Sequence, residues 1–243
     1  MRALSAAELL DVWERGLAQS PAQRALTLLV AACRDAPIEK LAQFSVGERD
    51  ACLLAFREET FGSRLASLTQ CPACAEEVEL QIETSDLYAA KPQAEALLRV
   101  DMADHAIEFR LPTSLDVASL DLAADAKINR QQLLQRCVIS ARRGEVEVTP
   151  AELPDEAVAA VTRRMSEIDP QADVQLSLTC PRCQYAWQTP LDIVSYFWSE
   201  IHAWAHRTLR EIHILAAAYG WREAEVLALN PWRRHAYLEL IQS

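Results

Sequence analysis

The stretches Cys71-Pro72-Ala73-Cys74 and Cys180-Pro181-Arg182-Cys183 decide how this chain folds. Each stretch sets two thiolates on a tight turn, the arrangement called a zinc knuckle. Zn²⁺ prefers four tetrahedral ligands, and a closed site of four cysteines is structural because no coordination position remains for water. The two stretches together therefore predict one structural zinc ion, held by Cys71, Cys74, Cys180 and Cys183.

Strand-like alternation accompanies both cysteine pairs. Apolar side chains alternate with polar ones after the first pair and before the second, at Val78, Leu80 and Ile82 and at Val174, Leu176 and Leu178. Residues 75 to 179 separate the pairs, whereas roughly 15 to 20 residues separate them in an ordinary zinc ribbon. Closing a long loop costs only logarithmically more entropy than closing a short one. We therefore expect a split zinc ribbon, in which one hairpin is completed, an α+β segment is inserted and a second hairpin follows.

Two other interpretations of the cysteine pairs remain open at this stage. Each turn can simply carry buried free thiols, since free cysteine is among the most buried residue types. A CxxC pair can also exchange disulfides, but such a motif normally opens a helix that lowers the thiol pKa, and here strands follow. The remaining cysteines, Cys33, Cys52 and Cys137, fall on apolar helical faces and are expected to be core thiols.

Helix signals dominate both ends of the chain. Ser5, Ser20 and Ser45 each precede a Glu or Gln by three residues, which is the signature of a capping box, and they predict three N-terminal helices ending near Gly62. Apolar residues spaced by threes and fours predict one long helix from Leu191 to Tyr219. Gly220 is expected to end it, and shorter helices are expected over 223–229 and 231–240.

The sequence thus predicts an α+β fold in which helices flank a central β module. Between the cysteine pairs we expect a hairpin over 97–102 and 106–111, turning around Ala103-Asp104-His105, followed by helices between about 113 and 168. The expected division is an N-terminal helical region over 1–65, a split zinc ribbon with an inserted α+β segment over 66–190, and a C-terminal helical region over 191–243.

Composition and charge argue against several classes of function. The net charge of −11 opposes nonspecific attraction to nucleic acid and to anionic membranes. The five glycines form no phosphate-cradling motif, and no run of 18 apolar residues exists. No nucleophile motif of the GxSxG kind is present either. We expect a cytoplasmic, non-enzymatic protein with reduced thiols and neither a nucleic-acid nor a membrane partner.

The C-terminal third carries two further candidate features. His202 and His206 lie four residues apart on one face of the expected long helix, and Arg210 and His213 continue that face. No HExxH pattern and no third ligand accompany the two histidines, which favours a solvated or partner-facing basic stripe. Large aromatic residues are also frequent in this region and are interpreted either as core or as anchors of a protein interface. They are Trp187, Trp198, Trp204, Trp221 and Trp232.

Several stretches resemble one protein family. The segments that carry the resemblance are Ser45-Val46-Gly47-Glu48-Arg49-Asp50, Leu54 to Gly62, the first cysteine pair with its acidic strand, Leu111-Pro112-Thr113-Ser114, Asp169-Pro170, the second cysteine pair with Trp187, and Tyr219 to Glu225 with Arg233, Arg234 and Tyr237. Together they resemble the baseplate hub assembly chaperones of T-even-type contractile phage tails and related injection systems. The four cysteines depart from the shorter phage members of that family.

The resemblance implies a non-catalytic protein that helps to build a baseplate or its central hub through protein contacts. It implies baseplate or hub components as partners, a place in the host cytoplasm or in the finished tail particle, and no catalytic residues. The rival interpretations are a nucleic-acid-binding zinc-ribbon regulator, which needs a basic face, and a metal-dependent or thiol enzyme, which needs an open zinc position or an exposed reactive thiol.

Overall fold

Helices begin the chain where the sequence predicts them. The computed structural model describes residues 3–34, 36–89, 98–102, 104–120 and 125–242. Ser5, Ser20 and Ser45 each cap a helix in a complete capping box, as predicted. The short α3 was not predicted, because no side chain caps it and only Pro37 precedes it. The N-terminal helices are α1 (Ala6–Gly16), α2 (Pro21–Ala32), α3 (Ile38–Ala42) and α4 (Val46–Phe61).

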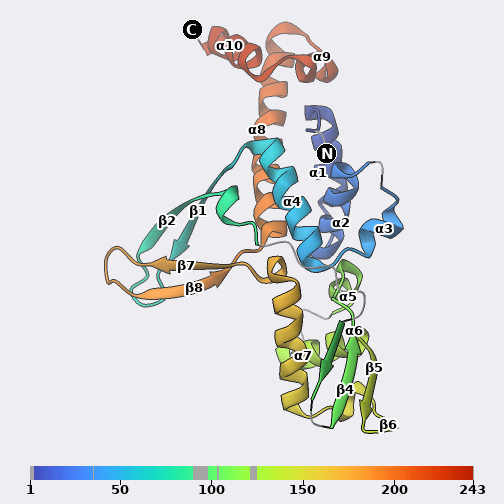
Figure 1. The fold of residues 1–243 in the computed structure, drawn as a ribbon. Coiled ribbons are helices and arrows are strands. Elements are labelled where there is room, and N and C mark those ends of the chain that lie inside the picture. The colour runs from blue at the N-terminus through green and yellow to red at the C-terminus, as the bar shows by residue number, and fades with distance from the viewer. Residues whose placement is uncertain (1–2, 35, 90–97, 103, 121–124, 243) are drawn as a thin grey trace.

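A long helix, α8 (Ile193–Tyr219), runs from the level of the hairpins to the tip that carries the C-terminal end of the chain (Figure 1). At about 1.5 Å per residue it is roughly 40 Å long. Gly220 ends it with a left-handed φ of 70°, as the sequence predicted, because glycine adopts this conformation without steric cost. Beyond it α9 (Glu223–Ala228) and α10 (Pro231–Gln242) lie at the far tip of the helix, away from the strands.

One hydrophobic core joins the N-terminal helices to α8. Leu28, Leu29 and Leu53 are fully buried, and Phe56 of α4 meets Phe197 of α8 edge to face, with ring centroids 5.3 Å apart. Leu65, which lies at the start of the first strand, is buried in the same core. The two helical ends of the sequence therefore form a single helical body.

Two antiparallel hairpins leave this body sideways (Figure 1). The first comprises β1 (Arg64–Gln70) and β2 (Glu77–Glu83), and the second comprises β7 (Gln175–Thr179) and β8 (Ala186–Pro190). Each hairpin is a separate sheet, and each carries one of the two cysteine pairs in its turn. The predicted α+β class is confirmed.

A small α+β module is inserted between the hairpins. Its strands pair in the order β3-β4-β5-β6, and the hairpin expected around Asp104 corresponds to β3 and β4, although Ala103 lies outside the described residues. Ile107 and Phe109 of β4 pack with Ala157 and Val161 of α7 in a second hydrophobic core. The module comprises β3 (Leu98–Asp101), β4 (His105–Phe109), α5 (Ser114–Ala118), α6 (Ala126–Cys137), β5 (Val138–Arg143), β6 (Val146–Glu147) and α7 (Asp155–Ile168).

Short 3-10 turns complete the described chain. The first follows the β1–β2 hairpin, the second precedes α7, and the third connects α7 to β7. They are η1 (Thr84–Asp86), η2 (Pro150–Glu152) and η3 (Pro170–Asp173). None of the helices among the described residues is long and apolar enough to cross a membrane.

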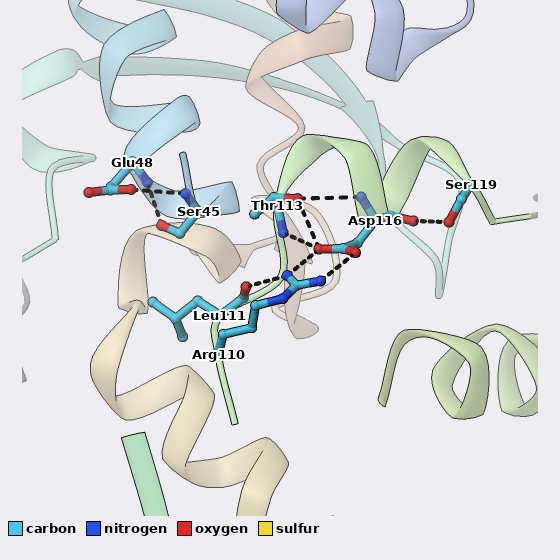
Figure 2. A network of polar contacts seen from close by, with 7 residues as sticks. All are labelled: Ser45, Glu48, Arg110, Leu111, Thr113, Asp116 and Ser119. Carbon is cyan, nitrogen blue, oxygen red and sulfur yellow. Dashed lines mark hydrogen bonds and ion pairs between the residues drawn. The ribbon is translucent and has the colours of Figure 1, made fainter. Parts of the chain in front are cut away.

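A polar junction fastens the module to the helical body (Figure 2). Ser45 and Thr113 form an isolated β-bridge, and the Val46 amide donates to the Pro112 carbonyl at 3.0 Å. Beside this bridge, Arg110 donates twice to the Asp116 carboxylate, at 2.6 and 2.8 Å. Ser45 is the N-cap of α4 and Thr113 is the N-cap of α5, so the N-termini of the two helices lie side by side.

Candidate metal centre

The turns of the two hairpins bring the four cysteines into one cluster. The Sγ atoms of Cys71, Cys74, Cys180 and Cys183 all lie within 4.8 Å of one another. Cys71 and Cys183 are 3.6 Å apart and Cys74 and Cys180 are 3.7 Å apart, and none of the four forms a disulfide. In a tetrahedron with metal–sulfur bonds of about 2.3 Å, neighbouring sulfurs lie about 3.8 Å apart. The cluster therefore has the spacing that a tetrahedral metal ion requires.

The same backbone turn builds both cysteine pairs. In the first turn the Cys71 amide donates to the Glu76 carbonyl at 2.8 Å, and the Ala75 amide donates to the Cys71 carbonyl at 2.9 Å. In the second turn Cys180 pairs with Tyr185 at 2.9 Å and with Gln184 at 3.0 Å in the same way. Each turn closes on a residue with positive φ.

The residues with positive φ are Ala75, at 57°, and Gln184, at 61°. The left-handed conformation is costly for residues other than glycine and persists only where the surrounding structure enforces it. Here two hydrogen bonds in each turn enforce it. The strain is thus repeated at equivalent positions of two segments that are far apart in the sequence, which indicates that both turns serve the same purpose.

Electrostatics in the cluster favour a bound cation. Backbone amides of Cys183 and Arg182 point at the Cys180 sulfur and lower the pKa of that thiol to about 7. For Cys74 the Glu76 amide acts in the same direction, but desolvation and hydrogen bonds with the neighbouring sulfurs outweigh it and raise the pKa to about 12. Adjacent thiolates repel one another, so a cation between the sulfurs would stabilise the charge of the cluster.

Little besides sulfur holds the hairpin tips together. The apolar cluster at the tips contains Cys71, Val78 and Cys180 as its buried members. Arg182 of one turn and Glu76 of the other form an ion pair of 3.0 Å, but both side chains are exposed, and exposed ion pairs contribute little. The geometry therefore assigns the role of joining the tips to the cysteines.

At its other end the first hairpin is anchored on a buried arginine. Arg57 of α4 is 2% exposed and donates to both carboxylate oxygens of Glu200 on α8, at 2.8 and 2.7 Å. It also donates to the carbonyls of Gly62 and Arg64, at the start of β1. One side chain thus connects two helices and the first hairpin.

Tyr196 provides a second anchor for the first hairpin. Its hydroxyl donates to the Ala66 carbonyl at 2.9 Å and accepts from the Ala66 amide at 3.0 Å. The side chain thereby takes the place that a neighbouring strand would occupy at the edge of β1. Because Tyr196 lies on α8, it fixes the edge of the hairpin against the long helix.

Comparison with models of known protein families assigns the chain to one family. The family model described as T4 bacteriophage base plate protein matches residues 14–198. The chain belongs to this base plate protein family. No curated protein and no solved structure matches it. The match covers α2 to α4, the start of α8, the whole inserted module and both cysteine pairs.

Within this base plate family protein, three of the stretches that carry the resemblance converge on the junction. Val46 bonds to Pro112, and the Gly47 amide donates to the buried carboxylate of Asp169 at 2.9 Å. A Cβ atom at Gly47 would lie 2.6 Å from Asp169 Cγ and 2.9 Å from the Ala172 backbone nitrogen. Glycine is therefore required at residue 47 by the close approach of the chain that follows α7.

The remaining candidate residues of the sequence analysis lie apart from the cysteine cluster. His202 accepts a hydrogen bond from the Trp13 indole at 3.0 Å, and His202 and His206 stack edge to face with centroids 4.5 Å apart. No group of three or more metal-binding side chains other than the four cysteines occurs in the described part of the chain. Cys137 is fully buried as expected, whereas Cys33 and Cys52 are only partly buried.

Sequence reasoning missed the anchors of the first hairpin. Arg57 and Tyr196 follow no motif, and their partners Glu200 and Ala66 are more than a hundred residues away in the sequence. The available signal was weak: an arginine on a helix just before the first cysteine hairpin, on a face that the apolar pattern would place inside.

Proposed function

We propose that this protein is a non-catalytic structural or assembly component of the baseplate of a contractile tail, and that it acts through contacts with other baseplate or hub proteins. The observation that carries the proposal is the match of the base plate family model over residues 14–198. Its place of action is then the host cytoplasm during assembly, the tail particle, or both.

A structural zinc ion is the second part of the proposal. Cys71, Cys74, Cys180 and Cys183 supply four soft thiolates at tetrahedral spacing, and this ligand set suits Zn²⁺. All four positions around the metal are then taken by protein, so the ion would contribute stability and no reaction. The metal would tie β1–β2 to β7–β8 and so hold both ends of the inserted module in place.

Charge supports a protein partner over nucleic acid. Glu77 and Glu79 are exposed on one face of β2, Glu76 directly precedes this strand and Glu83 ends it. A zinc ribbon that binds phosphate backbones needs a basic face in this region. The acidic hairpin instead fits a partner that presents basic side chains.

Metal analysis tests the zinc proposal directly. Purified protein is expected to contain about one zinc per chain, and Cys71→Ser or Cys180→Ser is expected to abolish binding. Cys33→Ser is the matched control, because Cys33 is only partly buried and lies outside the cluster. A native, fully folded protein without metal would overturn the structural zinc site.

Genetic complementation tests the baseplate proposal independently of the metal. Deletion of the gene in its phage or injection system is expected to stop the formation of contractile tails, and the wild-type gene is expected to restore it. Mass spectrometry of purified tails then distinguishes a component that stays in the particle from an assembly factor that leaves. Normal tails in the deletion strain would refute the proposed role.

A further inference from the structure

The last helix, α10, exposes an apolar stripe. Trp232 is 84% exposed and Leu240 is 66% exposed, and Ala236 lies exposed between them. These residues follow one another at intervals of four, so they share one face of the helix. A tryptophan with most of its surface in water is unusual, because tryptophan is highly buried on average.

The opposite face of α10 is firmly fixed to the rest of the molecule. Tyr237 packs edge to face on Trp221, with centroids 4.9 Å apart, and Trp221 stacks on Tyr219 at the end of α8. The buried Arg234 forms an ion pair of 2.8 Å with Glu211 of α8. The exposed stripe is therefore presented by a rigid helix, which lowers the entropy cost of binding.

We infer that the stripe of Trp232, Ala236 and Leu240 binds the same stripe of a second copy of this chain, with the two α10 helices antiparallel. Reversing one helix about Ala236 brings Trp232 of each copy level with Leu240 of the other. The small Ala236 side chains then face each other at the centre and permit close approach. A parallel arrangement would instead place Arg233 beside Arg233.

Polar groups beside the stripe are complementary in this arrangement. His235 and Glu239 lie on the same flank of α10, with His235 Nε2 3.2 Å from the Glu239 carboxylate within one chain. In the antiparallel pair, Glu239 of the first copy comes near the level of His235 of the second copy. His235 of the first copy likewise comes near the level of Glu239 of the second. This contact is reciprocal, as an interface with two-fold symmetry requires.

The position of α10 favours a contact between copies over one within a chain. The helix lies at the tip of α8, away from the hairpins and the inserted module (Figure 1). Residues 199–243 contain five arginines and five glutamates, so the whole net charge of −11 resides in residues 1–198. Two copies that meet tip to tip therefore keep their acidic parts apart, which limits electrostatic repulsion.

The proposed interface is small, so its affinity is expected to be low. A helix of 12 residues buries less than the ~1,000 Å² that a stable complex usually needs. The association is therefore expected to be weak and to depend on concentration. This inference goes beyond the proposed baseplate role and depends on neither the metal nor the partner proteins.

Sedimentation velocity of the full-length, metal-loaded protein tests the inference. The wild-type protein is expected to shift from monomer to dimer as its concentration rises. Trp232→Ala should weaken the association at least about tenfold, as truncation of an aromatic anchor residue usually does. Ala236→Glu should abolish it, because two carboxylates would meet at the two-fold axis. Both positions are exposed, so circular dichroism should show unchanged folding.

Leu68→Ser is the matched control, because Leu68 is 63% exposed but lies on β1, far from α10 in the sequence. It should leave the association unchanged. A wild-type protein that stays monomeric at all concentrations would overturn the inference. So would a dimer that tolerates both Trp232→Ala and Ala236→Glu, or one that is lost in Leu68→Ser.

Discussion

The helical body and the hairpin tips are held together by different physical means. The body buries Leu28, Leu29, Leu53 and Phe56 completely, so its stability derives from apolar surface removed from water. At the tips only Cys71, Val78 and Cys180 are buried, and Cys74, Leu80 and Trp187 pack against them partly buried. A cluster of that size cannot support a fold alone. The difference teaches that the tips need a further link, which the proposed metal–sulfur bonds would supply, whereas the body does not.

Metal removal should produce the largest difference in stability between the hairpin tips and the helical body. Structural zinc binding in small zinc-finger peptides is worth about 10 kcal/mol or more. A strong chelator is therefore expected to abolish hydrogen-exchange protection in residues 64–83 and 175–190, while α4 and α8 stay protected. Metal that is added back should restore the protection. Equal loss of protection in hairpins and helices would contradict this division of the molecule.

Arg57→Ala should lower the stability of the contact between the first hairpin and the helical body. The substitution leaves Glu200 without its charged partner and removes the donors to the Gly62 and Arg64 carbonyls. Loss of one member of a fully buried ion pair costs about 3–5 kcal/mol. Because the Glu200 side chain is 25% exposed, chemical denaturation is expected to show a loss at or below the lower end of that range.

The double variant Arg57→Ala with Glu200→Ala should regain part of that free energy, because it removes the orphaned carboxylate. Arg64→Ala is the surface control, since the Arg64 side chain is 72% exposed. An effect of Arg57→Ala no larger than that of Arg64→Ala would show that the anchor is unimportant.

Asp116→Asn should reveal the pH dependence of the junction. Hydrogen bonds from Arg110 lower the pKa of Asp116 to about 2, from an ordinary value of 3.8. The carboxylate therefore stabilises the fold above the unfolded pKa, and this stabilisation is lost as the pH falls toward about 2. Because Arg110 is partly exposed, we expect a cost of about 1–2 kcal/mol at neutral pH.

The variant and the wild-type protein should become equally stable near pH 2, when the free energy of unfolding is measured across the acid range. A difference between them that stays constant with pH would mean that the charge of Asp116 does not contribute. Asp101→Asn serves as a control, because Asp101 is exposed and lies outside the junction.

Ala75→Gly should have the smallest effect on stability, and it tests whether the turn at the tip of the first hairpin is strained. Glycine relieves the left-handed strain at φ 57°, which raises stability by up to about 1 kcal/mol. Ala73→Gly is the control, because Ala73 lies in the same turn but not among the residues with positive φ. Thermal unfolding of the metal-loaded hairpins measures both. If Ala75→Gly lowered stability as much as Ala73→Gly, the turn would not be strained.

Local signals in the sequence predicted most of the helices and strands. Ser5, Ser20 and Ser45 start helices in the structure because a hydroxyl three residues before a Glu or Gln satisfies backbone amides without help from elsewhere. The helix α3 was missed because it has no such cap. The division of the chain at residues 65 and 190 stays a prediction, although the helices on both sides share one core.

Long-range contacts could not be predicted in the same way. The sequence left open whether the C-terminal tryptophans are core or interface residues, and the structure buries Trp198 but exposes Trp232. Both residues lie on helices whose sequence does not show a clear division into an apolar and a polar face. Whether each tryptophan is buried therefore depends on which neighbouring helix packs against it. The contact of Gly47 with Asp169 likewise depends on how the inserted module returns to the body.

The sequence by itself determined the four-cysteine pattern, the turns that carry it and the helices at both ends, because caps and tight turns are decided by residues within a few positions of each other. Only the tertiary structure decided that Arg57 and Tyr196 anchor the first hairpin and that α10 presents Trp232 to solvent. These features depend on the packing of segments that are distant in the chain, and packing energy has no signature within a single segment.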